Sequence, residues 1–262
     1  MTVHVETVER DVLRVHCRSW RGNAVGYDVS AYLVRGVLVD TGFPRVRGDV
    51  MTAVEQIAPR GAVVTHWHED HAGNAPAFVA AGIPLLLDAR CESTLRERPH
   101  IALYRSLTWG VTPPLAAPVV PFDASPLEVI PTPGHTADHQ VLWDAERRIL
   151  ASGDLFLGVK VRVAHEHESP RRLLESLRRV AALEPRLLLD AHRGPLTNVV
   201  PLLQAKIEWM EATMGEMLAL ARMGAEEGEI QQRVLGSEEF VGRVSFGEYS
   251  KLAFVRAVLR DG

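Results

Sequence analysis

Hydrophobic and polar positions alternate along the N-terminal part of the chain with the period of two that is typical of half-buried strands. Val3–Glu9 and Asp11–Cys17 are predicted to form a hairpin, and Tyr27–Val34 and Val37–Asp40 are predicted to follow as strands. The apolar positions of Asp49–Ala58 then recur at helical spacing. The chain therefore opens with a sheet that is followed by a helix.

In the rest of the chain, segments typical of strands again alternate with segments of helical spacing. Ala62–Thr65 is a short apolar run that predicts a buried strand, whereas residues 98–121 have little periodicity and predict a long surface excursion. Further strands are predicted at Pro84–Leu87, Leu127–Pro131, Val141–Asp144, Arg148–Ser152 and Arg186–Asp190, and further helices at Ala72–Ala81, Pro170–Leu183 and Val200–Met223. Strands, helix, strands and helix, repeated once, predict an α/β fold of two sheets with helices outside.

The chain has 262 residues, which is enough for one large domain with a small addition. We expect an α/β domain over residues 1–200 and a helical C-terminal extension or cap, packed on that domain, over residues 201–262.

Composition narrows the class of protein. Apolar residues make up 47% and charged residues 24%, which is typical of a globular chain, and the net charge of −4 argues against nucleic acid as a partner. The two cysteines, Cys17 and Cys91, lack CxxC spacing and indicate a reducing compartment. There is no signal-peptide pattern and no apolar run of about 18 residues, so we expect a cytoplasmic protein without a membrane span.

A dense polar cluster follows the predicted strand at residues 62–65. The segment 66–71 reads His-Trp-His-Glu-Asp-His and supplies the imidazole and carboxylate groups that bind zinc and similar cations. If residues 66–70 are extended, His66, His68 and Asp70 point the same way, and His71 begins the next element. The spacing predicts a metal site rather than a solvated loop.

Three more candidate ligands each follow a predicted strand and lie beside a glycine or close to one. They are His135 in Pro133-Gly134-His135-Thr136, Asp154 in Ser152-Gly153-Asp154, and His192 in Ala191-His192-Arg193-Gly194. His139 is predicted to be a structural hydrogen-bonding residue near the site. His165 and His167 also form an HxH pattern, but acidic residues surround them and no buried strand precedes them, so a solvated loop is predicted.

In order and spacing, these motifs resemble the metallo-β-lactamase superfamily over roughly residues 10–200. Val39-Asp40-Thr41-Gly42 is similar to the early aspartate motif of that family. The resemblance implies a four-layer αβ/βα sandwich, the metallo-β-lactamase fold, with metals held in a cleft at the sheet edges. The C-terminal part is similar only loosely to the helical extensions of the glyoxalase II-like and lactamase-like endoribonuclease branches of these hydrolases.

The resemblance also implies roles for individual residues. His66, His68 and His135 would hold one metal, Asp70, His71 and His192 would hold a second, and Asp154 would bridge the two. Asp40 would fix the histidine-bearing loop through hydrogen bonds.

Two departures from related branches refine the expected function. The best-known β-lactamases carry cysteine where this chain has Asp154, and flavodiiron proteins carry glutamate where it has His68. Neither antibiotic hydrolysis nor electron transfer is therefore expected.

The expected function is hydrolysis of a small ester, thioester or lactone with a binuclear centre, zinc first and iron or manganese as alternatives. Asp70 is the candidate catalytic residue, because it could ligate one ion and accept a proton from the attacking water. The alternatives are an endoribonuclease or phosphodiesterase of the same fold, a mononuclear iron enzyme resembling the persulfide dioxygenases, and a non-catalytic binding module. A homodimer is compatible with the sequence, and the expected partner is a small-molecule substrate.

Four further residues are candidates for substrate binding. Tyr104 and Trp109 could line the pocket or pack against the sandwich, and Lys160 and Arg193 could bind a carboxylate or phosphate.

Overall fold

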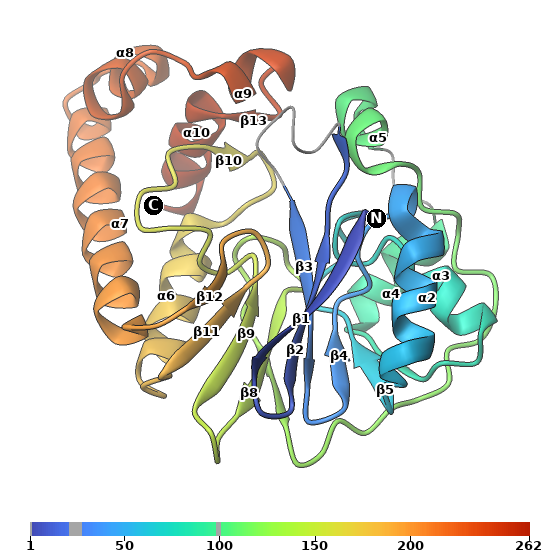
Figure 1. Ribbon diagram of the computed structural model, residues 1–262. Helices are drawn as coiled ribbons and strands as arrows, with labels where there is room; N and C mark the ends of the chain where they lie inside the picture. Colours follow the sequence, from blue (N-terminus) through green and yellow to red (C-terminus); the bar gives the residue numbers. More distant parts are fainter. Residues whose placement is uncertain (1, 21–27, 98–100) are drawn as a thin grey trace. The chain divides into compact units, whose positions relative to one another are not determined.

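The computed structural model describes residues 2–20, 28–97 and 101–262, and the chain divides into two compact units (Figure 1). Tyr27 and residues 98–100, which belong to a predicted strand and to the predicted excursion, lie outside the described residues. The first unit comprises Met1–Pro131, Asp138–Asp154 and Leu187–Thr197, and the second comprises Thr132–Ala137, Leu155–Arg186 and Asn198–Gly262. These units divide the chain differently from the expected boundary at residue 200, which stays a prediction.

The first sheet of the first unit is mixed and has the order β1-β2-β3-β4-β5-β6. Neighbours from β1 to β4 are antiparallel, whereas β4, β5 and β6 are parallel. The strands are β1 (Val3–Glu9), β2 (Val12–Cys17), β3 (Val29–Val34), β4 (Val37–Val39), β5 (Gly61–Val63) and β6 (Leu85–Leu86).

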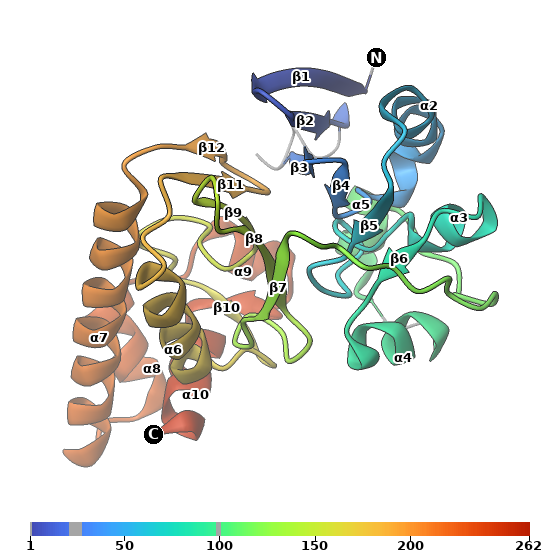
Figure 2. The same ribbon diagram turned by 90° about the horizontal axis from the view of Figure 1, so that it is seen from below.

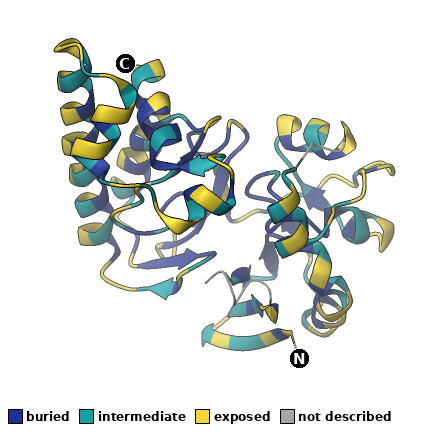
Figure 3. Cartoon of the chain, turned by 90° about the horizontal axis from the view of Figure 1, so that it is seen from above, coloured by how far each residue is buried: buried dark blue, intermediate teal, exposed yellow. Residues whose placement is uncertain are grey.

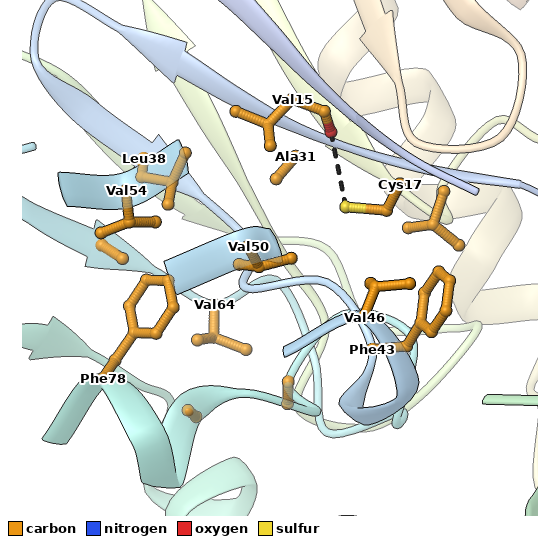
Figure 4. Close-up of a cluster of buried hydrophobic side chains, with 14 of the residues drawn as sticks. Val15, Cys17, Ala31, Leu38, Phe43, Val46, Val50, Val54, Val64 and Phe78 are labelled. Carbon is orange, nitrogen blue, oxygen red and sulfur yellow. Dashed lines mark hydrogen bonds between the residues drawn. The ribbon is translucent and has the colours of Figure 1, made fainter. Parts of the chain in front are cut away.

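Helices of the first unit cover one face of this sheet. Val50 and Val54 of α2 belong to the same buried cluster as Leu38 of β4 and Val64, the residue directly after β5 (Figure 4). Burying such aliphatic side chains contributes about 1.5–3 kcal/mol each. The elements on this side are η1 (Pro44–Val46), α2 (Arg47–Ile57), α3 (Ala75–Ala80), α4 (Ala89–Glu97) and α5 (Leu103–Trp109).

The second sheet, also in the first unit, has the order β12-β11-β9-β8-β7 and is mixed because β9 and β11 are parallel. Tyr32 and Val63 of the first sheet share one buried cluster with Leu142 and Leu189 of the second, so the two sheets pack face to face. The strands are β7 (Glu128–Pro131), β8 (Gln140–Asp144), β9 (Ile149–Gly153), β11 (Leu187–Asp190) and β12 (Gly194–Leu196).

The parallel pairs determine where the polar loops begin. Parallel neighbours end at the same sheet edge, so the loops after β4 and β5 start together, as do those after β9 and β11. Gln140 connects the two sheets, since its backbone N–H donates to Thr65 O at 2.9 Å and its side-chain amide donates to Val64 O at 2.8 Å.

The second unit is mainly helical. In Figure 2, α6 and α10 lie beside the long helix α7, and Met217, Ile230 and Val255 belong to its buried apolar cluster. Its elements are β10 (Ala164–His165), α6 (Pro170–Ala181), α7 (Val199–Arg222), α8 (Glu227–Ile230), η2 (Gln231–Leu235), α9 (Phe240–Val244), β13 (Tyr249–Ser250) and α10 (Lys251–Asp261). Strongly exposed residues lie mainly on helices and loops (Figure 3). Among the described residues, no helix combines the length and the apolarity that crossing a membrane requires.

Two local features differ from the picture that the sequence suggested. Residues 66–70 are not extended, because β5 ends at Val63 and the backbone N–H groups of His71 and Ala72 both donate to His68 O in a turn. The predicted excursion contains the helix α5, whose buried residues are only Arg105 and Trp109, so its sequence shows little apolar periodicity.

Candidate metal centre

Asp40 follows β4 directly and is held in the left-handed region, with φ of 67°. Its buried carboxylate accepts hydrogen bonds from Thr65 N at 2.7 Å and from Thr65 Oγ1 at 2.9 Å. It also lies 2.8 Å from His71 Nδ1, where only the imidazole can donate to an ionised carboxylate. Asp40 therefore connects the start of the histidine loop to its last histidine.

The tautomers of three histidines follow from their partners. Thr65 Oγ1 donates to Asp40, so it accepts from His66 Nδ1 at 3.0 Å. His192 Nδ1 lies 2.9 Å from the backbone carbonyl of Asp28, which can only accept. In His66, His71 and His192, the Nε2 atom is consequently left as the ring atom that can bind a cation.

The structure brings six of the seven predicted ligands together at the strand ends of the first unit. The candidate ligand atoms of His66, His68 and Asp154 lie within 4.8 Å of one another. Those of Asp70, His71 and His192 form a second group under the same limit. The site is thus a pair of His/Asp clusters rather than a single one.

Asp154 lies between the two clusters. Its Oδ1 is 3.1 Å from His71 Nε2 and 3.2 Å from His192 Nε2, and its Oδ2 is 4.0 Å from His66 Nε2. Its two oxygens therefore face different clusters, which is the arrangement that a bridging carboxylate requires.

Asp70 lies close to both histidines of the second cluster. Its Oδ2 lies 3.5 Å from His192 Nε2 and 3.7 Å from His71 Nε2.

Carboxylates dominate the electrostatics of the second cluster. Burial lowers the pKa of His192, but the carboxylates of Asp154 and Asp70 outweigh this and raise it to about 9. Burial likewise opposes the charged form of His71, yet the same carboxylates and Asp40 raise its pKa well above the ordinary value. Burial would raise the pKa of Asp154, but His71 and His192 hold it well below its ordinary value. The buried carboxylates of the site therefore need compensating positive charge, which protons on the histidines or bound metal ions can supply.

The donor set fits divalent metal ions. His71 Nε2 is buried without a hydrogen-bond partner among the described residues, although carboxylate oxygens lie close to it. Leaving a buried polar atom unbonded costs about 1–3 kcal/mol, which a coordinated ion would offset. Imidazole nitrogen and carboxylate oxygen together suit zinc, iron and manganese.

Two supporting residues come from one segment at the start of β8. Asp138 Oδ2 accepts a hydrogen bond from Trp67 N at 2.9 Å, inside the histidine loop. His139 Nε2 accepts from Asp154 N at 3.1 Å, so the prediction of a structural role for His139 is confirmed. No role was predicted for Asp138 from the sequence. The feature that could have identified it is its position shortly after the motif Pro133-Gly134-His135.

A close contact explains the glycine before Asp154. Gly153 has φ of 48°, and a Cβ there would lie 2.8 Å from Thr65 Oγ1 and 2.9 Å from His139 Nε2. No larger residue fits at this position without displacing Thr65 or His139, which support the site.

An ion pair, also missed from the sequence, holds the centre of the histidine loop. Arg105 of α5 donates to Glu69 Oε1 at 2.7 Å and to Glu69 Oε2 at 2.6 Å, and both side chains are buried. Its guanidinium also lies 5.6 Å from the centre of the Trp67 ring. A single arginine in a weakly periodic segment carries no sequence signal for this bidentate contact.

His135 lies in the second unit, on the turn Thr132–Ala137, and its place as the seventh ligand stays a prediction. Gly134 packs directly on α6, since a Cβ there would lie 2.4 Å from Leu173 Cα. Ser169 N donates to Gly134 O at 2.8 Å, and Ser176 Oγ donates to Pro133 O at 2.8 Å. Helix α6 and the residue before it therefore hold this turn.

The candidate substrate residues fall in different environments. Trp109 lies in the core of the first unit, with its ring centre 5.0 Å from that of Phe43, so the structure favours the packing role over the pocket role. Tyr104 is half-buried on α5, and Arg193 is exposed after β11. Lys160 is exposed in the second unit. Substrate contacts by Tyr104, Lys160 and Arg193 stay predictions.

A family model described as the metallo-beta-lactamase superfamily matches residues 24–192. The chain belongs to the metallo-beta-lactamase superfamily. The order of the clusters along the sequence and the two face-to-face sheets agree with this membership.

Curated members of the superfamily are similar over part of their length. A beta-lactamase-like protein 2 homolog from Caenorhabditis elegans is 31% identical over 182 residues, which cover 66% of this chain and 57% of that protein. A hydroxyacylglutathione hydrolase from Shewanella oneidensis is 30% identical, with 62% of this chain and 58% of that protein covered. The chain thus spans little more than half the length of these relatives.

Solved structures share the fold. A metallo-beta-lactamase family protein from Thermus thermophilus has a TM-score of 0.70 at 19% identity, with 97% of this chain and 95% of that chain covered. The metallo-beta-lactamase FIM-1 from Pseudomonas aeruginosa, in a mono-zinc form, has a TM-score of 0.62 at 19% identity, with 81% and 96% covered. The metallo-beta-lactamase fold predicted from the sequence, with its helical C-terminal extension, is confirmed.

Proposed function

We propose that this protein is a hydrolase that uses two zinc ions to cleave a small ester, thioester or lactone. The observation that carries the proposal is the position of Asp154, whose two oxygens face separate His/Asp clusters. The name of the Shewanella oneidensis relative, a hydrolase, supports the reaction class, and the mono-zinc form of the Pseudomonas aeruginosa structure supports the metal.

The proposed ligand sets follow the two clusters. His66 and His68, with His135 as their third imidazole, would hold one ion, and Asp70, His71 and His192 would hold the other. When bound, such ions lower the pKa of a water molecule toward about 7 and polarise an acyl oxygen of the substrate.

The chain's own residues orient the reacting groups. Asp40 fixes His71 by accepting from Nδ1, and the carbonyl of Asp28 fixes His192 in the same way. Asp70 uses one oxygen toward the second cluster and, in this proposal, accepts the proton of the attacking water through the other. No serine or cysteine nucleophile is required.

An acyl substrate is preferred over a phosphodiester because of charge. The chain carries a net charge of −4, which gives no general attraction for a polyanion. The two cysteines of the chain, Cys17 and Cys91, are buried free thiols, which fits the proposal of a reducing, cytoplasmic location.

The test is a substrate panel assayed on protein that has been stripped of metal and reloaded with zinc. Small thioesters, esters and lactones should be hydrolysed, and Asp70→Asn should retain most of the zinc but lose most of the turnover. Matched assays would use a structured RNA, a phosphodiester and a persulfide with iron-loaded protein. Activity confined to any of these three, or unchanged turnover in D70N, would contradict the proposal.

A further inference from the structure

Glu168 is a buried carboxylate in the second unit, two residues before helix α6, which holds the His135 turn. Its Oε1 accepts a hydrogen bond from His165 N at 2.9 Å and lies 3.5 Å from His135 Nδ1. Both contacts are made within the second unit.

We propose that Glu168 is the positioning residue of His135: it accepts from Nδ1–H and thereby turns Nε2 toward the metal. The proposal rests on the proposed function, because it assumes that His135 binds a metal ion. A carboxylate on the far nitrogen of a ligand imidazole fixes its tautomer and raises its basicity, and loss of such a partner typically weakens metal binding 10–100-fold.

The segment that carries Glu168 is built to hold this carboxylate in place. His165 lies in β10, which pairs with β13 near the C-terminus, and its Nε2 is 3.0 Å from Glu248 Oε1. The prediction of a solvated loop was therefore wrong for His165, which is buried, although His167 is exposed.

The C-terminal helix α10 secures the same segment. Arg260 donates to the backbone carbonyls of Glu166, at 2.7 Å, and of Glu168, at 2.5 Å. Ser169 Oγ, which caps α6, donates to Asp261 Oδ2 at 2.6 Å. This gives the helical C-terminal extension a specific task, which is to hold the residue that orients a metal ligand.

The neighbouring Glu166 provides a matched control. It has the same charge and lies two positions away, but its side chain is 68% exposed and its ion-pair contact is with exposed His167, at 3.5 Å. Glu166→Gln removes the same charge without touching His135.

The experiment measures zinc binding to wild-type protein, E168Q and E166Q by competition with a chromophoric chelator. We expect E168Q to bind one of two zinc equivalents 10–100-fold more weakly, with an altered visible spectrum for cobalt(II) in that site. E168Q should bind the other zinc equivalent with wild-type affinity, and E166Q should bind both equivalents with wild-type affinity. The metal-free forms of all three proteins should unfold at similar temperatures.

A second variant covers the case in which E168Q does not fold. Arg260 is about half exposed, so Arg260→Gln should fold, and it should weaken the same zinc equivalent by a smaller factor. Wild-type affinity at both equivalents in E168Q, or in R260Q where E168Q is unfolded, would overturn the role of Glu168. Failure of the wild-type protein to bind two ions would instead overturn the proposed function.

Discussion

The predicted metal ligands are held in place in two different ways. In the first unit, six of them stand at the ends of parallel strands, and Asp40, Asp138 and the Asp28 carbonyl orient them or the loop that carries them. In the second unit, His135 stands on a short turn that is packed on α6 and faced by Glu168. A sheet edge can therefore gather many ligands at once, whereas an isolated ligand needs its own local support.

The strongest effect should come from removing the group that the two clusters share. Asp154→Asn should abolish tight binding of both zinc ions and lower turnover by at least about a thousandfold, because it removes charge from both clusters. Metal analysis and kinetics measure this, with Asp123→Asn, an exposed aspartate that bonds Ser125, as the control. Retention of one tight ion in D154N would show that Asp154 serves a single cluster.

Breaking the buried pair in the histidine loop should destabilise the first unit. Arg105→Met leaves Glu69 buried without its bidentate partner, which typically costs about 3–5 kcal/mol. Urea denaturation measures the loss. The double variant R105M/E69Q should recover part of it, and a single variant as stable as wild type would refute this role of the pair.

Without bound metal, the stability of the protein should depend on pH through the histidines of the second cluster. The pKa of His192 is raised to about 9 in the fold and is near 6.5 in an unfolded chain, so its stabilisation is complete below pH 6.5 and is lost as pH rises through about 9. The raised pKa of His71 acts in the same direction.

We therefore expect the free energy of unfolding of the metal-free protein to fall by about 3 kcal/mol from His192 alone over this interval. Zinc-loaded protein should not show this loss, because its ligands are already deprotonated. Denaturation at several pH values tests this, and a metal-free stability that stays constant or rises would count against it.

The smallest effect should come from removing a hydrogen bond that orients a metal ligand while the ligand itself is kept. Asp40→Asn keeps an acceptor for Thr65 but can no longer offer carboxylate oxygens to both Thr65 and His71 Nδ1. Zinc affinity should fall about 10–100-fold at the second cluster only. Chelator competition measures it, and an equal loss at both clusters would place Asp40 in a general structural role instead.

Much of the first unit could be predicted because its strands carry strong local patterns. The runs at Val29–Val34 and Leu187–Asp190 are wholly buried, and the polar residues that follow them stand out against these apolar segments. The histidine motif is also local, so six adjacent residues were enough to predict that its side chains belong to one metal site.

What could not be predicted depends on contacts between distant segments. Arg105 and Glu69 are 36 positions apart, and the carbonyl of Asp28 meets His192 across 164 positions. The strand pair β10–β13 has only two residues on each side, which is too short to leave a periodic pattern, so Glu168 and His165 resembled a solvated loop.

The proposed chemistry depends on two cations sharing Asp154, and the metal content of the purified protein is the decisive measurement. After zinc loading and removal of excess, we expect two zinc ions per chain in wild type and fewer than one in D154N. A wild-type protein that saturates at one ion, or that retains a single iron in preference to zinc, would show that the two clusters do not form a shared zinc centre.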